Sequence, residues 1–146
     1  RGILAEPLLY VSPYFERRRP EYYASLQSVR ERGTFSEWIA FFLRAVETQA
    51  LDAVKRAESL LGLGEEYRRR LRERKVRGGA LQLADHLIAN PYVTTTRTAD
   101  LLGVTTQGAA YAVRQLVEAG IVTDVGRVGR AQLYVCRDVL DVLQAP

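Results

Sequence analysis

The hydrophobic pattern of the chain is clearest over residues 94–135, where helical spacing gives way to strand spacing. Two short helices are predicted first, with Gly103 in the turn between them. Thr105 or Thr106 can cap the second helix, because a hydroxyl oxygen accepts from its unpaired N–H groups. Gly120 suits the end of that helix. Apolar side chains recur in the second helix at helical spacing and predict one buried face, formed by Ala109, Ala112, Val113, Leu116 and Val117.

A small antiparallel hairpin is predicted after the second helix. Its strands are residues 121–124 and 131–135, and its turn is residues 127–130, with Gly126 and Gly129 as hinges. Residues 92–94 can add a short third strand. Helix, turn, helix and hairpin in this order predict a winged helix-turn-helix, a module that places its second helix in the major groove of DNA.

The first half of the chain is predicted to be helical. Thr34 and Glu37 have the spacing of a capping box, in which each side chain satisfies a backbone N–H at the start of a helix. A long helix is therefore expected over about residues 36–61. Gly62 and Gly64 then separate it from the next helix, because glycine favours turns over helix interiors.

A charged helix over residues 65–75 follows, with little but Tyr67 and Leu71 to bury. Two glycines after this charge run mark the best domain boundary. We therefore predict a mainly α chain in two parts. Residues 1–77 form a helical part, and residues 78–146 form the winged helix-turn-helix domain with its small β-hairpin wing.

The composition is that of an ordinary globular domain, with 146 residues, 47% of them hydrophobic and 26% charged. No apolar run approaches the roughly 20 residues that a membrane span requires, so we expect no membrane association and a cytoplasmic location. The single cysteine, Cys136, excludes an internal disulfide and is expected to be a buried small hydrophobe. The chain opens with Arg1 and contains no methionine, so we expect it to be a piece of a longer protein.

The placement of charge matters more than the net charge of +4. Residues 1–75 carry 15 Lys/Arg and 11 Asp/Glu, whereas residues 76–146 carry six of each. Affinity for DNA comes largely from Lys and Arg against phosphates. A neutral winged domain is therefore a weaker DNA-binding candidate than its fold alone indicates.

Polar and basic side chains on the face of the second helix opposite the buried one are the candidate DNA contacts. Glutamine can pair with adenine and arginine with guanine, while basic residues on the wing and the preceding helix can meet phosphate. Ala110 and Tyr111 instead offer an apolar surface that suits a protein partner, including a second copy of the chain. Both hypotheses stay open. The candidate DNA-binding residues are Arg97, Thr106, Gln107, Tyr111, Arg114, Arg127 and Arg130.

The chain offers no catalytic, cofactor-binding or metal-binding constellation. Its only histidine, His86, follows Asp85 directly, and neighbouring positions do not share a helical face. No second histidine or cysteine group exists to complete a zinc site. We therefore expect this chain not to be an enzyme by itself.

Several segments of the first half resemble proteins of the Fic family. Residues 6–16 read EPLLYVSPYFE, residues 21–23 read EYY, and residues 38–43 read WIAFFL. They are similar to the helices that follow the catalytic loop in that family. The long helix, the charged helix and a C-terminal winged helix continue the resemblance over essentially the whole chain.

The resemblance implies a parent protein that transfers AMP from ATP to a hydroxyl of a target protein. The family's His-Pro-Phe-x-Asp/Glu-Gly-Asn-Gly-Arg loop supplies the base, the magnesium ligand and the phosphate contacts, and none of it is present here. The resemblance therefore implies a non-catalytic C-terminal portion. ATP, magnesium and the target protein would belong to the parent, and no catalytic residue is carried over.

Overall fold

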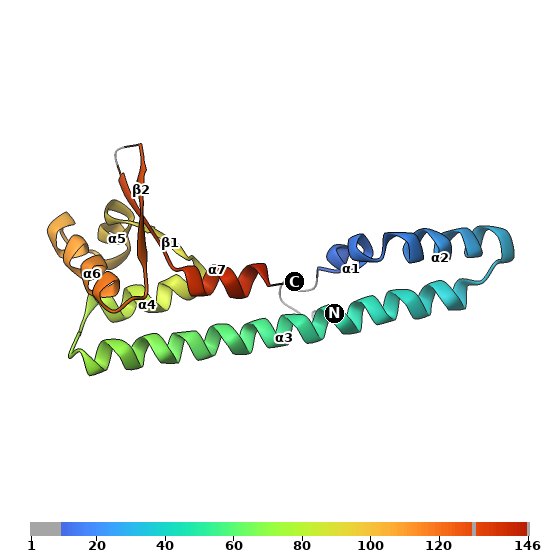
Figure 1. Cartoon of the computed structure of the whole chain (residues 1–146), viewed down its shortest axis with the longest axis horizontal. Coiled ribbons are helices and arrows are strands. Elements are labelled where there is room, and N and C mark those ends of the chain that lie inside the picture. Colours follow the sequence, from blue (N-terminus) through green and yellow to red (C-terminus); the bar gives the residue numbers. More distant parts are fainter. Residues whose placement is uncertain (1–9, 130, 146) are drawn as a thin grey trace. The chain divides into compact units, whose positions relative to one another are not determined.

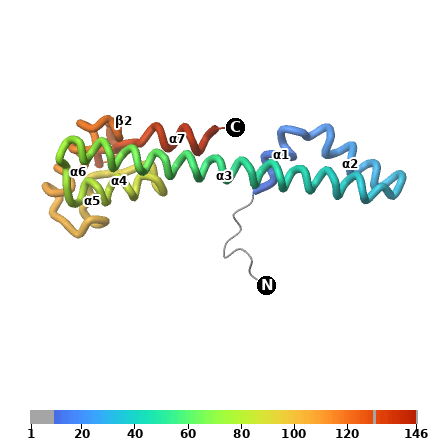
Figure 2. The backbone as a smooth tube through the Cα atoms, turned by 90° about the horizontal axis from the view of Figure 1, so that it is seen from below, coloured from blue at the N-terminus to red at the C-terminus, as the bar shows by residue number. Residues whose placement is uncertain are grey.

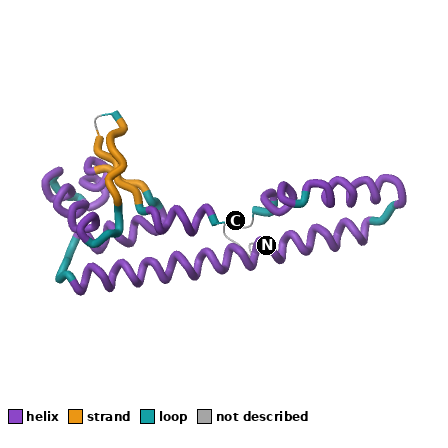
Figure 3. Tube along the Cα trace, in the orientation of Figure 1, coloured by secondary structure: helices purple, strands orange, loops and turns teal. Residues whose placement is uncertain are grey.

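The computed structural model describes residues 10–129 and 131–145. Within them the chain is mainly helical with a small antiparallel sheet, so the predicted fold class is confirmed (Figures 1 and 3). It divides into two compact units, Arg1–Lys55 (the first unit) and Arg56–Pro146 (the second unit). The elements are α1 (Ser12–Arg17), α2 (Arg19–Arg32), α3 (Phe35–Glu73), α4 (Gly79–Ala89), β1 (Tyr92–Thr94), α5 (Thr95–Leu102), α6 (Thr106–Glu118), β2 (Thr123–Val128), β3 (Ala131–Val135) and α7 (Arg137–Gln144).

Aromatic packing holds the first unit together. The ring of Phe15 lies 5.0 Å from that of Tyr22 and 5.9 Å from that of Phe41, measured between centroids. Tyr14 and Phe41 are buried, as is Ala45. Stacked and tilted rings at these separations each contribute about 0.5–1.5 kcal/mol beyond the area they bury. This cluster joins α1 and α2 to the N-terminal part of α3.

The start of α3 differs from the expected capping box. The side chain of Glu37 accepts a hydrogen bond from Ser28 Oγ at 3.0 Å, and Ser28 Oγ also contacts the hydroxyl of Thr34. Arg32 donates to the same serine at 2.7 Å. The capping-box side chains are therefore engaged by the end of α2, a tertiary contact that the local pattern did not reveal.

α3 runs without a break to Glu73, so the predicted separation at Gly62 and Gly64 is wrong (Figure 2). Glycine in a helix interior costs only about 1 kcal/mol relative to alanine, and packing outweighs this cost. Gly64 is buried against α4, where an added Cβ would lie 3.6 Å from Ile88 Cγ1. Further along the helix, Tyr67 and Leu71 are fully buried in the second unit.

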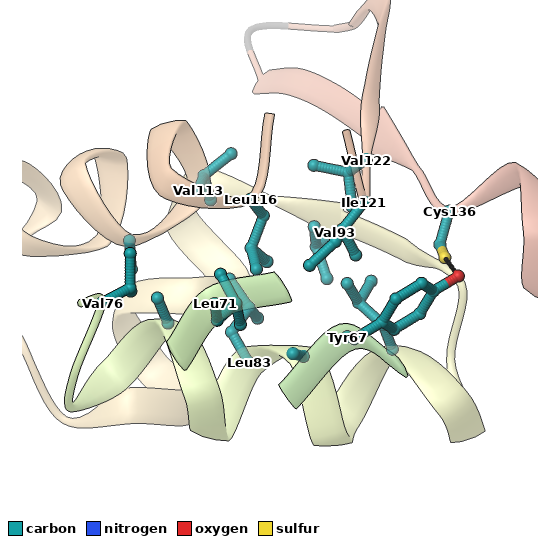
Figure 4. Packing of buried hydrophobic residues seen from close by; sticks show 14 of the residues in the cluster. Tyr67, Leu71, Val76, Leu83, Val93, Val113, Leu116, Ile121, Val122 and Cys136 are labelled. Carbon is teal, nitrogen blue, oxygen red and sulfur yellow. Dashed lines mark hydrogen bonds between the residues drawn. The ribbon is translucent and has the colours of Figure 1, made fainter. Parts of the chain in front are cut away.

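The core of the second unit combines side chains from α3, the winged elements and α7 (Figure 4). This arrangement makes the compact unit begin within α3, whereas the expected boundary lay between residues 77 and 78. A domain starting at Gly78 would lack the two α3 side chains that fill the centre of this core. The largest fully buried members are Tyr67, Leu71, Leu83, Leu87 and Leu116.

The sheet has the order β1–β3–β2, with both pairs antiparallel. The expected third strand is therefore present. β2 begins later than predicted, because Ile121 and Val122 are buried in the core before it starts. It also extends beyond the predicted end, to Val128. A register shift lies between Asp124 and Gly126, and Gly126 adopts φ 99° at this bulge. Two residues of the predicted turn at 127–130, Arg127 and Val128, belong to β2 instead.

Candidate nucleic-acid interface

Two threonine caps and a left-handed glycine fix the helix-turn-helix. Thr94 Oγ1 accepts from the backbone N–H of Arg97 at 3.3 Å at the start of α5, and Thr105 Oγ1 accepts from that of Gly108 at 3.2 Å at the start of α6. Gly103 lies between the two helices with φ 62°. The predicted turn is confirmed, and of the two threonines that could cap the second helix, the structure selects Thr105. Each cap contributes about 1 kcal/mol.

The buried face of α6 is confirmed except at one position. Four of its five expected members are buried, but Val117 is 39% exposed. Val117 lines a second-unit hollow of about 410 Å³ together with Ala110, Arg114, Asp124 and Tyr134. This residue therefore faces the space between α6 and the wing.

The opposite face of α6 is open to solvent and brings four candidate residues together. Thr106, Gln107, Tyr111 and Arg114 are all exposed, and Tyr111 is 59% exposed. The guanidinium carbon of Arg114 lies 5.8 Å from the centroid of the Tyr111 ring. This cation–π contact holds the arginine along the helix face. The face presents polar, basic and aromatic groups suited to base edges or to a protein surface.

The remaining candidates come from the elements beside α6. Arg97 is exposed in the first turn of α5. Arg127 is exposed on β2, and its Nε donates to Gln132 Oε1 of β3 at 3.2 Å, so it is tied across the wing. Arg130 lies outside the described residues.

The second unit is more basic than the winged segment alone. By sequence, residues 56–146 carry 13 Lys/Arg and 10 Asp/Glu, because the compact unit includes the end of α3. Much of that charge is paired: Arg68 meets Asp85 at 2.8 Å, and Arg70 meets Glu66 at 2.8 Å. By contrast, Lys75, Arg77, Arg97 and Arg114 form no ion pair with any residue between 10 and 129 or 131 and 145.

Sequence reasoning missed three cations beside the candidate face. Arg74, Lys75 and Arg77 line a hollow of about 430 Å³ that also includes Tyr111 of α6. They were assigned to the other domain because two glycines follow them. The sequence did contain a signal for their position. These cations directly precede α4, the first helix of the predicted winged domain, so they must lie close to it.

The histidine and the cysteine of the second unit, the side chains best suited to catalysis or metal binding, lie in ordinary structural surroundings. Asp85 pairs with Arg68, which leaves His86 without an acidic partner at that position. Cys136 is fully buried, its sulfur lies 3.1 Å from the hydroxyl of Tyr67, and burial raises the pKa of its thiol. The described residues contain no group of three metal-ligating side chains. They also contain no helix with the length and hydropathy of a membrane span.

No family model matches the sequence. The functional argument therefore depends on the winged fold of the second unit and on the residues that it exposes.

Proposed function

We propose that the second unit binds double-stranded DNA, with α6 as the major-groove helix and the β2–β3 hairpin as the wing. The observation that carries the proposal is the solvent-exposed, polar and basic face of α6 on a winged helix-turn-helix framework. The extent of the second unit supports it further, because residues 56–75 add seven basic and four acidic side chains to a segment that carries six of each.

In this proposal the exposed residues divide into two roles. Gln107 offers an amide that matches the donor and acceptor of adenine, and Arg114 offers a guanidinium that matches guanine. Each such bidentate pair discriminates against a wrong base by about 1–3 kcal/mol. Arg97 and Arg127 contact phosphates, which positions the helix without reading sequence.

We further propose that this chain belongs to a Fic-type parent protein in which the winged unit directs an AMP transferase to its target. The support for this step is the resemblance of residues 6–16, 21–23 and 38–43 to that family. ATP, magnesium and the target protein would bind elsewhere in the parent.

A protein-interaction or homodimerisation role is the second candidate. Tyr111 and Val117 expose apolar surface on α6, and Ala110 is exposed as well. An apolar interface and a phosphate interface respond differently to salt. Counterion release makes DNA binding weaken steeply as salt rises, whereas burial of apolar surface does not weaken.

Fluorescence anisotropy with mixed-sequence duplex DNA, at low and at physiological salt, tests the DNA proposal. We expect binding that falls with salt, and weaker binding in Arg114→Ala and Arg127→Ala. Arg30→Ala is the matched control, because Arg30 is an exposed arginine of α2 in the first unit. Absence of binding at low salt, or an equal loss in all three variants, would sink the proposal and favour the protein-interaction role.

A further inference from the structure

A hollow of about 430 Å³ in the second unit lies between the end of α3 and one flank of α6. Its rim carries Arg74, Lys75 and Arg77 from the segment that joins α3 to α4. Its walls include the apolar side chains of Leu102 and Val104 and the aromatic ring of Tyr111. This volume lies within the roughly 300–1,000 Å³ typical of small-molecule sites.

The charged side chains that line the hollow are all basic. No acidic side chain lines it. One of these basic residues, Arg74, has a partner outside the lining, since its guanidinium nitrogen lies 3.7 Å from Glu118 Oε2. Lys75 and Arg77 have no ion-pair partner in the described part of the chain. Like charges gathered in this way repel one another, so an anion placed among them is favoured.

The backbone holds these cations in place at some cost. Lys75 adopts φ 58°, a left-handed conformation that a non-glycine residue rarely takes. Two backbone hydrogen bonds fix the turn, from Lys75 N–H to the carbonyl of Arg72 at 2.8 Å and from Val76 N–H to that of Leu71 at 2.9 Å. Val76 is buried in the core immediately beyond. These two bonds form the common C-terminal cap of a helix, in which the residue after the cap takes the left-handed conformation, so the end of α3 fixes where the three cations leave the helix.

The apolar wall is also set by close packing. A Cβ added to Gly79 at the start of α4 would lie 3.0 Å from Leu102 Cδ1, so α4 and α5 approach closely here. Leu102 ends α5, Val104 lies in the turn that follows, and Tyr111 belongs to α6, so the wall is formed by the helix-turn-helix itself. The hollow therefore combines a basic rim with an apolar interior.

We propose that this hollow binds a small organic anion, a carboxylate or phosphate attached to an apolar, planar body. The anionic group lies between Lys75 and Arg77, and the body packs against Leu102, Val104 and the ring of Tyr111. This site is separate from the base-reading role proposed for α6. An apolar body without charge would leave the basic rim without a counterion, and a free inorganic ion would leave the apolar wall uncovered.

Tyr111 connects the site to DNA binding, because it belongs both to the hollow and to the exposed face of α6. A ligand against its ring competes with DNA for this side chain, so the anion acts as an effector that weakens DNA binding. This coupling rests on the proposed function, whereas occupancy of the hollow does not.

NMR titration of the full 146-residue chain with 1-naphthoate tests occupancy, with the neutral 1-naphthalenemethanol as the comparison probe. We expect saturable shifts at the backbone amides of Gly79, Ala80 and Gly108 with naphthoate only. Lys75→Gln combined with Arg77→Gln should weaken binding about tenfold, the loss expected for about 1.4 kcal/mol of charge-assisted contact. Arg30→Gln is the control and should leave the affinity unchanged, because Arg30 is an exposed arginine of α2 that does not line the hollow.

Gln115→Glu provides a second variant that keeps the side-chain shape and places a negative charge in the lining of the hollow. It should weaken naphthoate binding in a protein that remains folded by circular dichroism. Equal binding of both probes, shifts confined to other surfaces, or unchanged affinity in Gln115→Glu would overturn the proposal.

A DNA titration of the same proteins separates the two proposals. Naphthoate binding without DNA binding would support the anion site and refute the DNA role. If the Lys75 and Arg77 changes weaken DNA binding while naphthoate shows no shifts, these cations serve DNA phosphates and the small-anion site is refuted.

Discussion

At the scale of single residues, the hydroxyl of Tyr67 joins α3 to the C-terminal elements of the second unit. It lies 3.1 Å from the sulfur of Cys136 (Figure 4). It also donates to Asp138 Oδ2 at 3.2 Å. The sequence indicated that Tyr67 and Cys136 would be buried, and both are. Their contact was not predictable, because 69 positions separate them and only the packing of α3 brings them together.

Removing this hydroxyl should weaken the second unit while leaving its packing intact. We expect Tyr67→Phe to lower the free energy of unfolding by about 1 kcal/mol, because the ring remains and only the hydrogen bonds are lost. Urea denaturation measures this change. Tyr23→Phe is the control, since Tyr23 is 55% exposed in the first unit. If Tyr67→Phe and Tyr23→Phe changed the unfolding free energy equally, the hydrogen bonds of the Tyr67 hydroxyl would contribute nothing specific to stability.

Alkaline pH should destabilise the second unit through the same pair. Burial raises the pKa of Tyr67 above its ordinary value of 10.0 and that of Cys136 above 9.0, so folding favours both neutral forms. Their contribution is fully present below about pH 9 and is lost as the pH rises beyond the ordinary values, because only the unfolded chain then ionises readily. Between neutral pH and a pH above 10, the unfolding free energy should fall less in the double variant Tyr67→Phe, Cys136→Ala than in the unchanged chain. An equal fall of the unfolding free energy in the two proteins would show that ionisation of Tyr67 and Cys136 does not cause the loss of stability.

At the scale of elements, tertiary packing decided where α3 ends. The glycines at 62 and 64 have the local signature of a break, but the helix continues to Glu73 because its later side chains complete the second-unit core. Salt bridges such as Arg69 to Glu73 at 2.6 Å add to the exposed side of the same helix. Exposed pairs of this kind contribute little, so core packing is the dominant cause.

Two glycine substitutions distinguish a continuous helix from a turn. An added Cβ meets no atom within 4 Å at either Gly62 or Gly78, so the backbone alone decides the effect. Gly62 lies inside α3, and Gly62→Ala should raise the unfolding free energy by up to about 1 kcal/mol. Gly78 adopts φ 72° and ψ −132° before α4, and Gly78→Ala should lower it by about 1–3 kcal/mol. Thermal and urea unfolding measure both changes. A lower unfolding free energy in Gly62→Ala would contradict the continuous helix.

At the scale of the whole molecule, the compact units determine which charges accompany the winged fold. The division within α3 places the Arg74, Lys75 and Arg77 side chains in the same unit as α6. The boundary expected from the two glycines assigned all three to the other part and left the winged part without a net positive charge. The electrostatic case against DNA binding therefore depended on where the boundary was drawn.

Truncated chains test this division directly. A fragment of residues 56–146 should fold and bind duplex DNA as the full chain does, because it retains every member of its core cluster. A fragment of residues 78–146 lacks Tyr67 and Leu71, and losing even one large core side chain typically costs about 2–5 kcal/mol. We expect it to be largely unfolded by circular dichroism and by amide NMR dispersion. A well-folded 78–146 fragment would restore the boundary at the glycines.

The sequence by itself determined the features that depend on near neighbours. A threonine cap at the start of α6, the turn at Gly103, the mainly α class with its wing and the exposed face of α6 all follow from side chains a few positions apart. Only the tertiary structure decided the continuity of α3, the contact of Tyr67 with Cys136 and the gathering of three cations beside Tyr111. These depend on which segments pack together over long separations, and the free energy of that packing exceeds the local preferences that a sequence pattern records.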